Sequence, residues 1–126
     1  MPKPLSLTKR ELDIMSVLWR RKTATVGEIR DELTDDLAYP TVQTMLRVLE
    51  SKGYVRHTQD GRAFRFHPLV AQDDLADSVL RRLVSKVYHG SRELLVTRLI
   101  EDENISADEL RRIKKVLQRR INEAEE

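Results

Sequence analysis

Side chains able to read the edges of bases are spaced along a predicted helix in TVQTMLRVLESKGYV, residues 41–55. At 3.6 residues per turn, the apolar side chains of this segment share one face of the helix: Val42, Met45, Leu46 and Leu49. The opposite face carries Pro40, Gln43, Thr44 and Arg47. An amide can pair with adenine, a guanidinium with guanine, and the methyl group of threonine can contact thymine. We therefore predict DNA base contacts from this second face.

Composition limits the other functions that the chain could have. It has 126 residues, of which 35% are charged, and it contains four Gly and no Cys. This predicts a mostly helical protein of one domain, or of a small domain with an extension, and it excludes disulfides, thiolate metal sites and cysteine nucleophiles. Residues 1–68 hold 12 Lys and Arg against 9 Asp and Glu. The basic excess of the first half weakly favours a polyanionic partner there.

Several motifs of other protein classes are missing from the sequence. No apolar run reaches the roughly 20 residues of a membrane span, and the segment MPKPLSLTKRE lacks the apolar centre of a signal peptide, so we expect a cytoplasmic protein without a membrane partner. His57, His67 and His89 lack the spacing of a zinc site. We find no nucleophile elbow and no glycine loop for phosphates. The sequence therefore predicts no enzyme, no metal and no cofactor.

Capping signals mark helices before the segment described first. Thr8 with Glu11, and Thr25 with Glu28, fit the capping box at a helix start. The first helix is expected to turn Leu12, Met15, Leu18 and Trp19 inward. Pro40 suits the first turn of the third helix, and Gly53 suits the position just past its end.

A β-hairpin is predicted next, in YVRHTQDGRAFRF, where two β-rich runs flank Asp60-Gly61. Three helices followed by a hairpin predict a winged helix-turn-helix domain over residues 1–69, in which the third helix enters the major groove. Contacts to the DNA backbone are expected from Lys9, Arg10, Thr41, Arg56, Arg62 and Arg65. The fold class is therefore mainly α with a small β-hairpin wing.

Residues 70–126 form a second predicted domain of three helices with wide apolar stripes. A segment of this size is near the lower limit for an independent core, so a partner subunit is expected to cover the stripes. The predicted dimerisation residues are Leu75, Val79, Leu83, Val87, Leu95, Leu99, Ile113 and Leu117. The alternative is that these helices fold back on the first domain.

Four stretches resemble the penicillinase repressor family, which includes copper-responsive members: LTKRELDIMSVLW, TVQTMLRVLESKGYV, DGRAFRFHPLV and VYHGSRELLVTRLIEDENIS. The most specific part is Thr41-Val42 with Thr44, Leu49 and Lys52-Gly53. The resemblance implies a homodimeric transcriptional repressor with an N-terminal winged helix and a C-terminal helical dimerisation domain. It also implies that the partner is double-stranded DNA, namely a dyad operator upstream of resistance genes.

The chain departs from the family at some matched positions. Gln43 stands where staphylococcal members have arginine, whereas Thr41 and Thr44 match threonines. The family is released from DNA by a regulatory protease that cuts between asparagine and phenylalanine, and the matching positions here are Arg98 and Leu99. The cysteine pairs of the copper-responsive members are absent. Two alternatives remain: a winged helix that binds proteins, and a ligand-responsive regulator without proteolytic release.

Overall fold

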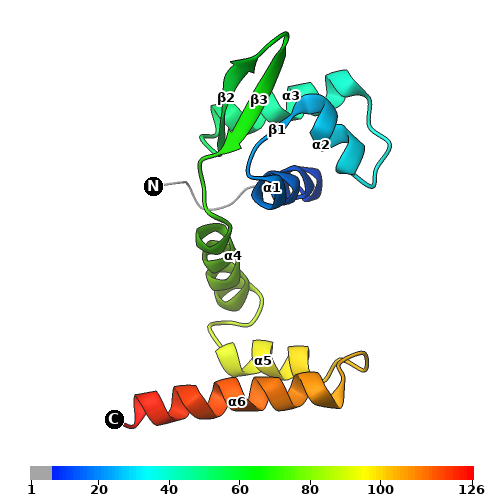
Figure 1. The fold of residues 1–126 in the computed structure, drawn as a ribbon. Coiled ribbons are helices and arrows are strands. Elements are labelled where there is room, and N and C mark those ends of the chain that lie inside the picture. Colours follow the sequence, from blue (N-terminus) through cyan, green and yellow to red (C-terminus); the bar gives the residue numbers. More distant parts are fainter. Residues whose placement is uncertain (1–6) are drawn as a thin grey trace. The chain divides into compact units, whose positions relative to one another are not determined.

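The computed structural model describes residues 7–126, which divide into two compact units (Figure 1). The first unit ends at Leu80 and the second runs from Arg81 to Glu126. The division therefore lies within a helix, α4 (Gln72–Lys86), and not between residues 69 and 70 as the sequence suggested.

The first unit is a winged helix, as predicted. Its elements are α1 (Lys9–Arg21), β1 (Ala24–Thr25), α2 (Val26–Glu32), α3 (Tyr39–Ser51), β2 (Val55–Asp60) and β3 (Ala63–Pro68). The strands form an antiparallel sheet in the order β1-β3-β2, and β2 and β3 form the wing (Figure 1). Strand β1 was not predicted, because two residues are too short to show a period in the sequence.

Both predicted capping boxes are present. The Thr8 hydroxyl accepts a hydrogen bond from the Glu11 amide at 3.1 Å, and the Glu11 carboxylate accepts one from the Thr8 amide at 2.9 Å. Thr25 and Glu28 repeat this arrangement at the start of α2. These reciprocal bonds satisfy amides that have no partner within the helix.

The turn of the wing is shifted by one residue from the predicted Asp60-Gly61 pair. Asp60 pairs with Ala63, so the two loop residues are Gly61 and Arg62. Gly61 has a φ of 62°, which suits the first loop position of a type II′ turn, where glycine is favoured. Arg62 is therefore carried at the tip of the hairpin.

The core of the first unit lies between the three helices and the sheet. Val42, Leu46 and Leu49 of α3 are fully buried, and Met45 is partly buried against the same core. In α1, by contrast, Leu12 is exposed although it was expected to face inward, and Ile14 and Val17 are buried. Met15 and Leu18 are fully buried as predicted, so Leu12 is the exception in α1. The inward face of α3 is as predicted.

The start of α4 belongs to the core of the winged helix. The Trp19 indole donates a hydrogen bond to the Val70 carbonyl at 2.9 Å, and Val70 and Leu75 join the buried cluster. Leu75 is only 4% exposed. Little of its side chain is left for the dimer interface in which it was predicted, because the chain after Pro68 continues along the first unit.

The second unit consists of the end of α4 followed by α5 (Arg92–Ile100) and α6 (Ala107–Ala124). His89 and Gly90 have positive φ values and separate α4 from α5, and Ser91 and Ser106 cap the next two helices. Neither α5 nor α6 has a buried residue. Over residues 7–126, no helix is both long enough and apolar enough to cross a membrane.

Candidate nucleic-acid interface

The outward face of α3 carries the side chains that were predicted to contact bases. Pro40, Thr44 and Arg47 are exposed and Gln43 is half-buried. The Thr44 hydroxyl donates a hydrogen bond to the Pro40 carbonyl at 3.0 Å, one turn back along the same helix. Arg47 makes no ion pair or hydrogen bond with any residue in the range 7–126. Its guanidinium is therefore available to an external acceptor.

Three of the cations predicted to contact phosphate are likewise exposed and unpaired. Lys9 begins α1, Arg56 lies on β2, and Arg62 lies at the tip of the wing. None of these three side chains has a hydrogen-bond or ion-pair partner in the part of the chain that the structure describes. Thr41, also predicted to contact the backbone, is exposed in the first turn of α3.

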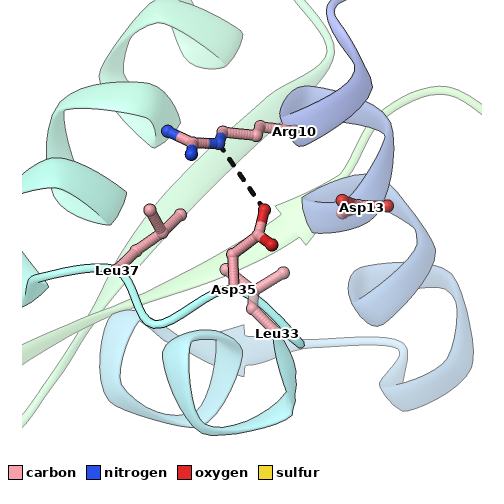
Figure 2. Close-up of a pocket in the computed structure, with 5 residues that line it drawn as sticks. All are labelled: Arg10, Asp13, Leu33, Asp35 and Leu37. Atoms are coloured by element: carbon pink, nitrogen blue, oxygen red, sulfur yellow. Dashed lines mark ion pairs between the residues drawn. The ribbon is translucent and has the colours of Figure 1, made fainter.

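Arg10 has an internal partner. Its Nε lies 3.6 Å from Oδ2 of Asp35, and both side chains are well exposed. Figure 2 shows the pair across a small pocket that Asp13, Leu33 and Leu37 also line. An exposed ion pair of this kind contributes at most about 1 kcal/mol, so a phosphate could displace Asp35. Arg10 therefore offers a weaker contact than the unpaired cations.

Arg65 does not present its charge outward as predicted. Its Nε lies 2.9 Å from Asp60, and its Nη1 lies 3.2 Å from Thr23 Oγ1 and 3.3 Å from Glu28. These groups come from the wing, the turn before β1, and α2. Arg65 thus holds the wing against α2, because its Nε and Nη1 donors, which were predicted to contact DNA phosphate, already have acceptors within the domain.

Glu28 is the centre of this polar network. Its carboxylate accepts a hydrogen bond from the Thr25 amide at 2.9 Å and pairs with Arg21 at 2.8 Å and Arg65 at 3.3 Å. The hydrogen bond from the Thr25 amide, followed by the charges of Arg21 and Arg65, holds the pKa of Glu28 below its ordinary value, and partial burial opposes this shift. The ionised form of Glu28 therefore stabilises the junction of α1, α2 and the wing.

Two further polar contacts fix the C-terminal end of α3. His57 Nδ1 on β2 lies 2.8 Å from the Glu50 carboxylate, and the His57 ring packs on Phe64 with the centroids 4.4 Å apart. Lys52 Nζ lies 3.2 Å from Glu11, which is only 5% exposed. Sequence reasoning missed both pairs. Only the opposite charges of Glu11 and Lys52 could have suggested their pairing, since the two residues are 41 positions apart in the sequence.

His67 lies on the second strand of the wing. Its Nε2 is 2.9 Å from the Thr58 hydroxyl on β2. Partial burial, followed by the charges of Arg56 and Arg65, lowers the pKa of His67. Both causes favour the neutral form of the ring.

Together, the buried edge of α3, its polar outer face and the exposed Arg56 and Arg62 of the wing define a winged-helix protein with a cationic outer surface. Residues 7–119 match the sequence model of the penicillinase repressor. The chain belongs to the penicillinase repressor family.

Two similar regulators match almost the whole chain, and a similar solved structure matches part of it. The methicillin resistance regulatory protein MecI of Staphylococcus aureus is 26% identical over 120 residues, which are 94% of this chain and 98% of MecI. The transcriptional regulator BlaI of Mycobacterium tuberculosis is 32% identical, over 93% of this chain and 86% of BlaI. A solved structure of Bacillus licheniformis BlaI, as a monomeric form in complex with the blaP half-operator, is 33% identical with a TM-score of 0.50. The match covers 59% of this chain and 93% of the BlaI chain in that structure.

The lowered pKa of Glu28 predicts a pH dependence of stability. A carboxylate whose pKa is lower in the folded state stabilises the protein above its unfolded pKa, about 4.5, and loses this effect as the pH falls through the folded value. Glu28→Gln should lower the melting temperature at pH 7, and its difference from the wild type should shrink as the pH falls below 4.5. Thermal unfolding followed by circular dichroism from pH 7 to about pH 3 measures this.

Glu103→Gln is the matched control, since Glu103 is exposed and has no ion pair among residues 7–126. The melting temperature of Glu103→Gln should depend on pH as that of the wild type does. Equal dependence on pH in the wild type and in Glu28→Gln would show that Glu28 does not link protonation to folding.

Proposed function

We propose that this chain is a homodimeric transcriptional repressor that binds a dyad operator through its winged helix. The observation that carries the proposal is the outer face of α3, where exposed Pro40, Thr44 and Arg47 lie opposite a fully buried apolar edge. Two further facts support it: the relatives are named as regulators and repressors, and a BlaI domain of similar fold was solved with a half-operator. The proposed targets are resistance genes, as in the name of MecI.

In this proposal some side chains contact bases and the others contact phosphates. Arg47 pairs with guanine, Gln43 with adenine, and Thr44 and Pro40 contact base edges near the start of α3, since recognition helices read bases with their N-terminal residues. Lys9, Thr41, Arg56 and Arg62 contact phosphates and set the register of the domain on the duplex. Arg10 joins them when a phosphate displaces Asp35.

The rival function is a winged helix that binds another protein. The unpaired Arg47, Arg56 and Arg62 favour DNA, because phosphates and guanine edges are acceptors that suit guanidinium groups at several points of one surface. A gel-shift assay with the DNA upstream of the protein's own gene distinguishes the two functions. A protein-binding module would show no preference for that DNA over a random duplex.

Arg47→Ala and Arg62→Ala should weaken DNA binding in different ways. Loss of a base contact from Arg47 should cost about 1 to 3 kcal/mol on the operator and relax the preference at one base pair of each half-site. Loss of a phosphate contact from Arg62 should lower affinity evenly across sequences and reduce the salt slope by about one. Fluorescence anisotropy with operator and random duplexes at several salt concentrations measures both effects.

Arg30→Ala provides a control, since Arg30 is an exposed arginine of α2 that the proposal places outside the interface. Its affinity for DNA should remain close to that of the wild type. If Arg47→Ala binds operator and random DNA as the wild type does, the assignment of α3 to the major groove is wrong.

Dimerisation is proposed to occur through α4 and the second unit. Leu99 is 61% exposed and Leu117 is 47% exposed, and Val79 and Val87 are exposed on α4. Leu83, Leu95 and Ile113 are partly buried. A second copy covering these apolar side chains would supply the core that α5 and α6 lack. It would also place two recognition helices on successive major grooves, about 34 Å apart or a multiple of that distance.

Leu117→Glu should convert the dimer into a monomer, because it places a charge among the apolar side chains of α6. Asn122→Glu is the matched control: it adds the same charge to an exposed position of α6 away from the stripe. Sedimentation at micromolar concentration should find Leu117→Glu monomeric and Asn122→Glu dimeric. The loss of paired binding should weaken operator affinity by about 10²- to 10⁴-fold. A monomeric wild-type protein at this concentration would contradict the proposal.

The release mechanism of the family is proposed to act in α5, between Arg98 and Leu99. Both side chains are exposed, and a cut there would divide the proposed dimerisation unit. The residues differ from asparagine and phenylalanine, so a protease with a different preference is required. The alternative is that Leu99 serves only as a leucine of the dimer core and that a ligand or another stress releases the repressor.

The two release mechanisms differ in the fate of the chain in the cell. If proteolysis releases the repressor, exposure to a cell-wall antibiotic should produce fragments ending at Arg98 before transcription of the target gene rises. Mass spectrometry of the chain over time measures this. Persistence of the full-length chain while the target gene is induced would exclude proteolytic release.

A further inference from the structure

The outer face of α3 carries an apolar side chain that neither the core nor the predicted contacts use. Val48 is 42% exposed, although Leu49, which follows it in the sequence, and Leu46, two residues before it, are fully buried. It follows Thr44 by one helical turn, so the two side chains are neighbours, with Cβ atoms about 5–6 Å apart. Single exposed apolar residues are common on proteins. Val48, however, shares the surface of Thr44, one of the proposed base contacts.

The hydrogen bond of Thr44 changes what this residue can offer to a base. Its hydroxyl donates to the Pro40 carbonyl at 3.0 Å, so the proton is used inside the helix. Threonine and serine commonly turn their hydroxyls to the carbonyl four residues earlier in helices. The methyl group of Thr44 is then the part of the side chain left for an external contact. Thr44 and Val48 together present methyl groups along one line of the recognition helix.

Methyl groups in the major groove distinguish one base from the others. Thymine alone carries a 5-methyl group there, and apolar side chains recognise it by excluding water. Four residues of a helix advance about 6 Å along its axis, whereas base pairs are about 3.4 Å apart. Two methyl contacts made one turn apart therefore fall within about two base-pair steps of each other.

We propose that Val48 is a specificity-determining residue that, with the methyl group of Thr44, selects thymines at two nearby positions of each half-site. This inference rests on the proposed function, because it requires α3 to lie in the major groove. Val48 is assigned to a thymine because its side chain is apolar and lies one helical turn beyond Thr44. The hydroxyl of Thr44 orients its methyl group and does not donate to a base.

The test begins by selecting bound sequences from a pool of random duplexes with the full-length wild-type protein. Each thymine of the selected half-site is then replaced by uracil, which removes only the 5-methyl group. Fluorescence anisotropy gives the affinity for each duplex. At two nearby positions the replacement should weaken binding about fourfold, the factor that corresponds to the burial of one methyl group.

Variants assign each thymine to a side chain. Val48→Ala should bind the thymine and uracil duplexes equally at one of the two positions, and Thr44→Ser should do so at the other. Thr44→Val is the matched control, because it keeps a methyl group and removes the hydroxyl; it should remain sensitive to uracil. Circular dichroism and binding to random duplexes establish that each variant is folded.

Several outcomes would overturn the inference. A selected half-site without thymine, or tight binding that uracil leaves unchanged at every position, would exclude methyl recognition while leaving the repressor function intact. Sensitivity to uracil that persists in Val48→Ala at both positions would exclude Val48. If Thr44→Val loses the sensitivity and Thr44→Ser keeps it, the hydroxyl is the reading group. A pool without any preferred sequence would instead contradict the proposed function itself.

Discussion

Burial of one edge of α3 is the constraint on which the recognition surface depends. Val42, Leu46 and Leu49 are fully buried in the core that α1, α2 and the sheet share. Full burial of each such side chain is worth about 1.5 to 3 kcal/mol, and turning α3 about its axis would expose all three. The rotation of the helix is therefore fixed before any contact with a partner. Arg47 and Val48 face outward as a consequence.

Polar contacts then fix the wing against α2 and the end of α3 against α1, and they divide the cations into two groups. Arg65 binds acceptors on α2 and on the wing, and Lys52 pairs with the largely buried Glu11. These cations hold the domain together. Arg47 and Arg62 have no partner among residues 7–126 and are the cations that the proposed function assigns to bases and phosphates. A count of basic residues in the sequence cannot make this division, because it depends on which carboxylates lie nearby.

The two units differ in how they bury their apolar side chains. The first forms its own core and extends it to Val70, just before α4, and to Leu75 in the first turn of α4. In the second, α5 and α6 bury no residue. Small units bury a low fraction of their surface, so a set of exposed leucines on three short helices is costly in water. A second copy of the chain would remove this cost, and the two proposed roles of the protein then belong to different units.

The sequence alone determined the features whose partners are a few residues apart. The capping boxes of Thr8 and Thr25, the apolar edge of α3 and the glycine of the wing turn depend on local spacing, and all appear in the structure. Tertiary structure alone decided the burial of Leu75, the pairing of strand β1, and the internal partners of Arg10, Lys52 and Arg65. Arg65 and Thr23 are 42 residues apart, and Trp19 and Val70 are 51 apart. No period or motif in the sequence records such contacts, because they exist only when folding brings distant segments together.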